Sequence, residues 1–474
     1  MTIASVIKLT TIDSEILITA ILKMGLETFV PCTLESSMRF DMKNSKDKRL
    51  KFRFQKYAKQ LCLETFFLFL LYSCNLDASA GYKNTGSIVI EDAPNLLINF
   101  NTVSPAFSGK DIQLGIDRLH LFVDSLRGKN IAIVCNQTSM VKGVHLLDTL
   151  LALKLNVVKV FSPEHGFRGD IGAGEKIHSS VDPKTGIPLV SLYGTHKKPT
   201  ELDLVDVDIV IFDIQDVGVR FYTFLSTMHF VMEACAENNK QMVVLDRPNP
   251  NAHYIDGPIL ESAYTSFVGM HPVPIVYGMT IGEYALMING EGWLDKKLNC
   301  KVWIIPCKNY THKTKYTLPI YPSPNLRSDL AISLYPSLCL FEATTVSIGR
   351  GTERPFEIYG HPKFPKSNFV FSPTPGMSSS NPPQSYCLCN GYDLTSYSSK
   401  RSYEINLNYL TNARDLLSDS ITFIDQPSFF NRLAGNSTLK DQLVKGWSAR
   451  EIRETWKPGL AQFKEIRKKY LLYN

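Results

Sequence analysis

From about residue 111 onward, short apolar runs rich in β-branched residues alternate with stretches whose apolar residues recur at helical spacing. The apolar runs lie at 130–135, 157–161, 189–192, 208–212 and 242–245. Helical spacing occupies 144–153 and 220–237. Strands this apolar suit the middle of a sheet covered on both faces, and their alternation with helices indicates parallel pairing. The sequence therefore predicts an α/β fold with a doubly wound parallel sheet over residues 111–270.

The remainder of the chain, residues 271–474, predicts a second, smaller α+β auxiliary domain. Thr280 and Glu283 have the spacing of a capping box, in which each residue satisfies a free backbone amide of the other, so a helix is expected to begin there. The apolar run 302–305 predicts a strand, and the Pro- and Ser-rich stretch 361–385 predicts an exposed insertion.

Residues 42–74 have the order of a secretory signal. A basic stretch at 43–59 precedes the apolar run 65–72, and a small residue and Cys74 follow. The apolar run is shorter than the about 20 residues that a membrane-spanning helix needs. The end of the segment resembles a bacterial lipobox, which implies lipidation of Cys74 and a periplasmic or cell-envelope lipoprotein of a bacterium. The alternative is a buried amphipathic segment of the fold.

The residues on either side of this signal predict no domain of their own. Residues 1–41 form no pattern continuous with the signal segment, so we expect translation to start near Met38 or Met42 and the earlier residues to be a non-native extension. Residues 75–110 are rich in Asn, Ser and Gly, and we expect a tether that leads away from a membrane anchor.

Composition and absent motifs exclude several classes of function. The net charge of +6 comes mostly from the basic stretch at 43–59, so no patch suited to nucleic acid remains. None of the ten cysteines lies at zinc-ligand spacing. We expect Cys300 and Cys307 to be packed thiols, and the Cys387/Cys389 pair to be a chance feature of a loop rather than a metal or redox site. The sequence has no dinucleotide fingerprint, phosphate-binding loop or serine elbow.

Ligands of open parallel sheets bind beyond the carboxyl ends of the strands, so the loops that follow the predicted strands are the expected site. Glu164 lies in the loop after the second strand, close to Phe161 and Phe167. Apolar surroundings would raise the pKa of its carboxyl group by desolvation, as a general acid requires. The alternative is that Glu164 caps loop amides or pairs with Arg168.

Two aspartates follow the fourth strand. Asp213 or Asp216 would supply the second member of an acid and base pair, although Asp216 alternatively caps the next helix. The expected arginines of the site lie in loops or at helix starts, where a guanidinium group can hold a substrate carboxylate in a bidentate manner. They are Arg168, Arg220, Arg247 and Arg350. The alternative is that these arginines form ion pairs with Asp213, Asp246 and Glu342.

An ordered set of motifs makes the chain recognisable between Gly115 and Tyr470. The motifs are Ser162–Gly169, Ala173–Glu175, Ser191–Gly194 with Lys198–Thr200, Phe212–Thr223, Leu245–Pro250, Gly278–Glu283, Pro322–Asn325 and Gly349–Thr352. Together they resemble the NamZ family of exo-β-N-acetylmuramidases. The resemblance implies a Rossmann-like domain, a smaller auxiliary domain, and a cleft between them in which terminal N-acetylmuramic acid is released from the non-reducing end of peptidoglycan fragments.

The resemblance favours Glu164 as a catalytic carboxylate, assisted by Asp213 or Asp216. Arginines would bind the lactyl carboxylate of the sugar. The other expected substrate-binding residues are Asn136, His165, Gln215, Tyr222 and Asn249. This chemistry needs no metal or organic cofactor, and the membrane is contacted through the lipid anchor alone. The alternative function is a lipid-anchored protein that binds muropeptides without cleaving them.

Overall fold

The computed structural model describes residues 112–164, 166–167, 180–376, 379–397, 402–417 and 421–474. All of them belong to one compact unit, Ser104–Asn474. The predicted extension, signal segment with Cys74, and tether lie outside the described residues. His165 and Arg168 lie outside them as well.

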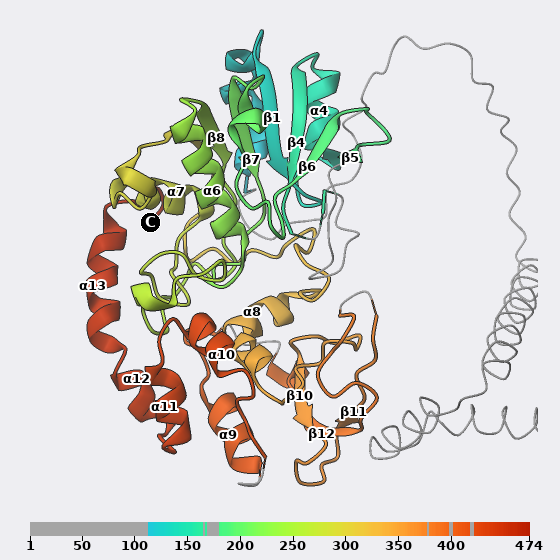
Figure 1. Cartoon of the computed structure of the whole chain (residues 1–474), viewed down its shortest axis with the longest axis vertical. Coiled ribbons are helices and arrows are strands. Elements are labelled where there is room, and N and C mark those ends of the chain that lie inside the picture. The colour runs from blue at the N-terminus through green and yellow to red at the C-terminus, as the bar shows by residue number, and fades with distance from the viewer. Residues whose placement is uncertain (1–111, 165, 168–179, 377–378, 398–401, 418–420) are drawn as a thin grey trace, which may run out of the picture. The chain divides into compact units, whose positions relative to one another are not determined.

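The central feature is a seven-stranded, mostly parallel sheet (Figure 1). Its strands, in spatial order, are β5 (Ser180–Val181), β6 (Pro188–Ser191), β4 (Asn156–Ser162), β1 (Asn130–Cys135), β7 (Ile209–Asp213), β8 (Gln241–Leu245) and β9 (Lys301–Ile305). The short edge strand β5 is antiparallel to β6, and every other pair is parallel. The five apolar runs are thus confirmed as strands of a mixed α/β fold.

Helices pack against this sheet. They are α4 (Leu146–Ala152), the short α5 (Glu201–Leu204), α6 (Phe224–Glu237) and α7 (Ile281–Gly290), and a small hairpin, β2 (Met140–Val141) with β3 (Val144–His145), precedes α4. Eleven of the fourteen residues of α6 are buried, which explains why its sequence is apolar on almost every side. Thr280 and Glu283 form the predicted capping box at the start of α7.

The helix predicted from residue 220 begins only at Phe224. The residues before it form a loop, because the backbone amide of Arg220 donates to the carbonyl of Ile275 and not along a helix. Gly218 makes this loop possible. Its φ is +80°, and a Cβ there would lie 2.1 Å from the side-chain oxygen of Asn249, so no other residue fits without displacing that side chain.

The sheet continues past residue 270, where we expected the first domain to end. Both α7 and β9 come after that residue, and β9 pairs with β8 in register from Gln241↔Lys301 to Leu245↔Ile305. The run 302–305 is therefore a strand, as predicted, but it belongs to the central sheet. Val302, Trp303 and Ile304 are only half-buried, as is typical of an edge strand, and the sequence of β9 did not indicate which sheet it would join.

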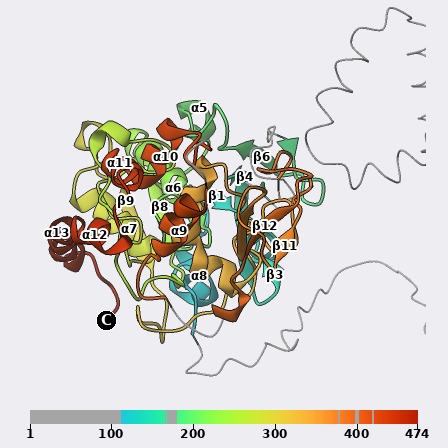
Figure 2. The ribbon, with the colours of Figure 1, turned by 90° about the horizontal axis from the view of Figure 1, so that it is seen from below.

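The rest of the chain forms a smaller C-terminal part (Figure 1). Its elements are α8 (Asp329–Leu338), the 3-10 helix η7 (Cys339–Ala343), β10 (Ile358–His361), β11 (Val370–Phe371), β12 (Cys389–Asp393), α9 (Asn408–Leu416), α10 (Pro427–Ala434), α11 (Thr438–Val444), α12 (Ala449–Glu454) and α13 (Lys457–Lys468). The strands form a separate antiparallel sheet in the order β10-β12-β11. Figure 2 shows that α11 and α12 lie on one side of this part and β11 and β12 on the other.

The C-terminal tail returns to the central sheet, and Figure 1 shows the chain end close to α7. The Tyr473 hydroxyl donates to the Asp246 carboxylate at 2.6 Å, and the backbone amide of Leu472 donates to Glu283 at 2.7 Å. Asp246 follows β8 directly, so the last residues of the chain fix the end of that strand. Among the residues described, none of the helices has both the length and the apolar character needed to cross a membrane.

Candidate active site

A cavity of about 190 Å³ lies between the carboxyl end of β4, the start of α6 and the C-terminal part. Six of its fourteen described lining residues are aromatic, two are acidic and one is an arginine. The lining residues are Glu164, Phe221, Tyr222, Thr223, Phe224, Val268, Ser323, Asn325, Leu326, Tyr335, Glu342, Arg350, Phe356 and Phe429. The cavity is thus at the sheet edge where parallel strands place their ligands.

Glu164 lines this cavity two residues after the end of β4. The hydroxyl of Thr223, the residue that precedes α6, donates to its carboxylate at 2.7 Å. The hydroxyl of Tyr193, which follows β6, also bonds to it. Burial, together with the charge of Glu164, raises the pKa of Tyr193 to about 12, so this hydroxyl keeps its proton at neutral pH. Loops after two neighbouring strands and the start of a helix therefore hold this carboxyl group.

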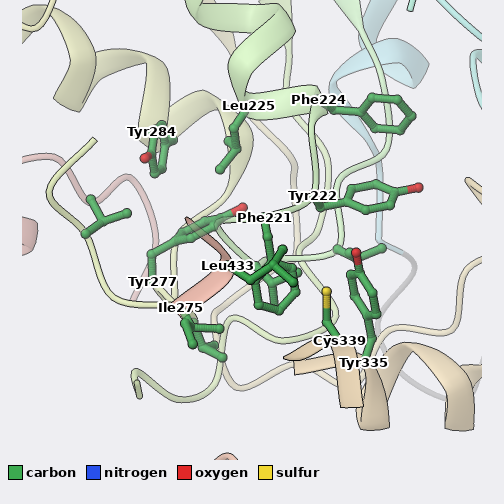
Figure 3. Close-up of a cluster of buried hydrophobic side chains, with 14 of the residues drawn as sticks. Phe221, Tyr222, Phe224, Leu225, Ile275, Tyr277, Tyr284, Tyr335, Cys339 and Leu433 are labelled. Atoms are coloured by element: carbon green, nitrogen blue, oxygen red, sulfur yellow. The ribbon is translucent and has the colours of Figure 1, made fainter. Parts of the chain in front are cut away.

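Aromatic rings are the largest group among the described residues that line the cavity, and Figure 3 shows Phe221, Tyr222, Phe224 and Tyr335 in a buried hydrophobic cluster. Tyr222 packs edge-to-face against Phe224, with ring centroids 4.8 Å apart, and against Tyr335 of α8 at 6.0 Å. Burial, with the charges of Asp216 and Glu164, raises the pKa of Tyr222 well above its usual range. Its buried hydroxyl has no hydrogen-bond partner in the described part of the chain, which leaves a donor for a ligand at the cavity.

Asp213 is placed elsewhere. It is fully buried at the end of β7, and its two oxygens accept hydrogen bonds of 2.7 and 2.9 Å from the guanidinium group of Arg247. Burial disfavours the charge of Arg247, but the charge and hydrogen bonds of Asp213 outweigh it and raise the arginine's pKa. Neither residue lines the cavity. The pair fits the alternative that we gave for this arginine, an internal ion pair.

Asp216 is also buried and does not line the cavity. Burial raises its pKa to about 6, while hydrogen bonds from the Tyr277 hydroxyl and the backbone amides of Gly218 and Val217 oppose that rise. The suggestion that Asp216 caps the next helix is wrong, because the N-cap of α6 is Thr223. Asp216 instead closes the tight turn at Gly218.

Arg220 is buried in the core and joins the two parts of the fold. Its guanidinium group donates to the carbonyls of Pro258, Val273, Leu433 and Ala434, at 2.6 to 3.1 Å. Burial lowers its pKa to about 9. The last two carbonyls belong to α10, so this side chain ties α10 to the loop before α6. It is not at the cavity.

The predicted amides are buried and take part in the loop structure. Gln215 donates to the carbonyl of Pro248 at 2.8 Å, Asn249 donates to the carbonyl of Met279 at 2.8 Å, and Asn136 accepts from the backbone amide of Thr138 at 2.9 Å. None of the three lines the cavity. Sequence position alone did not separate amides that hold loops together from amides that face a ligand.

Arg350 does line the cavity, and Glu342 lies beside it. Nη1 of Arg350 donates to Oε1 of Glu342 at 2.6 Å, and their side chains are 22% and 18% exposed. The buried Nε of Arg350 has no partner among the described residues. The sequence predicted for Glu342 only an ion pair with an arginine. Arg350 is an arginine that the sequence predicted for the site, whereas the position of Glu342 eight residues before it was too weak a signal to predict that Glu342 lines the cavity.

The described residues hold no group of three His, Cys, Asp or Glu side chains arranged as metal ligands. Cys300 and Cys307 are buried free thiols, which confirms the prediction of packed cysteines. Cys389 is a buried free thiol as well.

The fold and the cavity define the class of protein. It is an α/β protein with an acidic side chain in an aromatic cavity at the carboxyl end of a parallel sheet, an arrangement suited to an enzyme that acts on a sugar. The family is shown by two matching family models. The model of the N-terminal part of the exo-beta-N-acetylmuramidase NamZ matches residues 131–330, and that of its C-terminal part matches residues 333–473. The chain belongs to the NamZ family, as the motifs indicated.

Individual relatives agree with this assignment. The chain is 38% identical over 411 residues to the peptidoglycan beta-N-acetylmuramidase NamZ of Bacillus subtilis (strain 168), a match that covers 80% of this chain and 97% of the relative. Two crystal structures of DUF1343 family proteins from Bacteroides fragilis NCTC 9343 are similar in fold. Their TM-scores are 0.71 and 0.65 at 48% and 27% identity, and each match covers 77% of this chain and 99% of the other.

Proposed function

We propose that this chain is a glycoside hydrolase, an exo-β-N-acetylmuramidase that releases terminal N-acetylmuramic acid from the non-reducing end of peptidoglycan fragments. The family assignment and the name of the Bacillus subtilis relative support this activity. The observation that carries the proposal is the position of Glu164, whose carboxyl group lies at a cavity lined by aromatic rings and is bonded, among the described residues, by hydroxyl groups.

In this proposal Glu164 exchanges a proton with the glycosidic bond. Its described partners, the hydroxyls of Thr223 and Tyr193, fix the carboxyl group in place. Tyr222 would stack against the sugar or donate its free hydroxyl to it. Arg350 is the cationic side chain among the described residues that line the cavity, and in this proposal it binds the lactyl carboxylate of the substrate. His165 and Arg168, which follow Glu164 in the sequence, remain predicted substrate contacts.

The test is release of the aglycone from a chromogenic N-acetylmuramide by the wild type and by Glu164→Gln. The substitution keeps the shape of the side chain but removes its acid and base chemistry, which contributes typically about 10²- to 10⁴-fold in rate. We expect a loss of that size in kcat with unchanged thermal stability. Substrate binding without turnover by the wild type would instead establish the capture protein that the sequence left open.

We further propose that the central layer is a Rossmann-like, doubly wound sheet. The parallel strands β6, β4, β1, β7, β8 and β9 lie in the spatial order 3-2-1-4-5-6 when counted along the chain, the order of dinucleotide-binding sheets. In this chain the loop after β1 lacks the glycine-rich motif that binds a dinucleotide, and the loop after β4, the second parallel strand along the chain, carries Glu164.

We also propose that the mature protein is a lipoprotein of a bacterial cell envelope, anchored through Cys74. The basic, apolar and small-residue order of residues 42–74 supports this location. A substrate derived from peptidoglycan fits it. Mass spectrometry of the mature protein tests the anchor, because an unmodified peptide that spans Cys74 would contradict it.

A further inference from the structure

Two carboxyl groups lie at the cavity, and they come from different parts of the chain. Glu164 follows a strand of the central sheet, whereas Glu342 lies in η7 of the C-terminal part. They are the acidic side chains among the described residues that line it. Most glycosidases act with two carboxyl groups that flank the scissile bond. Asp213 and Asp216, the expected partners of Glu164, are buried away from this lining.

The two carboxyl groups have partners of different kinds. Among the described residues, the hydroxyls of Thr223 and Tyr193 bond to Glu164, and a hydroxyl group can either donate to a carboxylate or accept from a carboxyl group that carries a proton. Glu342 is bonded by the guanidinium group of Arg350 at 2.6 Å, and this group has no acceptor and keeps its charge. The cavity thus holds one carboxyl group whose described partners are hydroxyls and one whose partner is a guanidinium group.

The second carboxylate oxygen of Glu342, Oε2, has only a weak hydrogen-bond donor among the described residues. Oε1 accepts the bond from Arg350, whereas Oε2 is approached by the Cys339 thiol at 3.8 Å, and a thiol is a weak donor. Burial, with the charge of Glu342, raises the pKa of Cys339 well above its usual range, so the thiol keeps its proton. Figure 3 shows Cys339 beside Tyr335 at the base of the aromatic cluster. This contact leaves Oε2 with capacity to accept a further proton.

We propose that Glu342 is the second carboxylate of the reaction, an inference that rests on the glycosidase function proposed above. Glu164 gives its proton to the glycosidic oxygen as the bond from that oxygen to the anomeric carbon breaks. The oxygen of one water bonds to the anomeric carbon, and the proton that this water loses passes to Glu342. One water is consumed, and proton exchange with solvent restores Glu164 as the acid and Glu342 as the carboxylate. Arg350 then has two roles, because it orients Glu342 and leaves its Nε for the substrate.

The experiment compares Glu342→Gln and Glu342→Ala with the wild type on a chromogenic N-acetylmuramide. Loss of a general base predicts a fall in kcat of about 10²- to 10⁴-fold, with KM changed much less. Sodium azide or formate is then added to Glu342→Ala, because a small anion can fill the space of the deleted carboxylate. We expect the anion to raise the kcat of Glu342→Ala at least tenfold and to leave the kcat of the wild type unchanged.

Glu357→Gln is the matched control. Glu357 belongs to the same part of the chain, its side chain is 15% exposed and it pairs with Arg354 at 3.7 Å, but it does not line the cavity. We expect its kcat to stay within threefold of wild type. Thermal unfolding of each variant separates loss of chemistry from loss of fold, and the near-isosteric Glu342→Gln serves where Glu342→Ala does not fold.

Two results would overturn the inference. One is a folded Glu342→Gln that keeps wild-type kcat and raises only KM, since Glu342 would then merely orient Arg350. The other is a folded Glu342→Ala that no anion rescues. Both leave the proposed function standing, because the wild type and Glu164→Gln report on it separately. A wild type that releases no aglycone would remove the proposed function and this inference together.

Discussion

The buried ion pair of Asp213 and Arg247 allows a test of whether the role of Asp213 is structural or catalytic. Asp213 is fully buried and Arg247 nearly so, and two hydrogen bonds of 2.7 and 2.9 Å join the carboxylate to the guanidinium group. Asp213→Asn removes the charge but keeps the shape of the side chain. A buried arginine is then left without its counter-charge, which typically costs about 3–5 kcal/mol. We expect that loss in the free energy of unfolding.

The assay is urea unfolding followed by circular dichroism, with kinetics measured on the folded protein. Replacing both members with apolar residues, as in Asp213→Leu with Arg247→Met, removes the unpaired charge, and we expect the free energy of unfolding to return to within about 2 kcal/mol of wild type. The kcat of folded Asp213→Asn should stay within about tenfold of wild type, because Asp213 does not line the cavity. Native stability combined with a kcat reduced more than 100-fold would refute this reasoning and return Asp213 to the catalytic role.

Two further predictions concern the support of Glu164 and a buried histidine pair. Thr223→Val deletes the 2.7 Å hydrogen bond to Glu164, worth about 0.5–1.5 kcal/mol to a carboxyl group that carries its proton, so kcat/KM should fall roughly 2- to 10-fold. Thr223→Ser should stay near wild type, and equal rates for all three would contradict this prediction. His229 and His271 bond to each other at 3.0 Å, and burial lowers the pKa of both side chains. As pH falls, these histidines therefore bind protons in the unfolded chain at a higher pH than in the folded protein. The free energy of unfolding should decrease as pH falls below about 6.5. Unfolding free energies at pH 7.5 and 5.5 should differ less in His271→Gln than in wild type, and an identical pH dependence would refute this.

The strands of the central sheet were determined by local sequence. A run such as 130–135 is apolar on both faces, and in water it can be covered only by helices packed on each side, so composition and spacing fix its structure. The capping box at Thr280 was equally local, because its two residues satisfy each other's backbone amides. The domain boundary could not be predicted from local sequence, because β9 pairs with β8 although residues 246–300 lie between them in the chain.

The active-site motifs showed the family, and the sequence also showed that Glu164 follows a strand. The tertiary structure alone decided which polar residues face the cavity. Asp213, Arg220 and Glu342 each stand between two apolar residues in the sequence, yet the first two bond to groups far along the chain, at Arg247 and at α10. The burial of such a side chain and its hydrogen-bond partners depend on contacts between segments that are distant in the sequence. The spacing of residues along the chain does not predict these contacts.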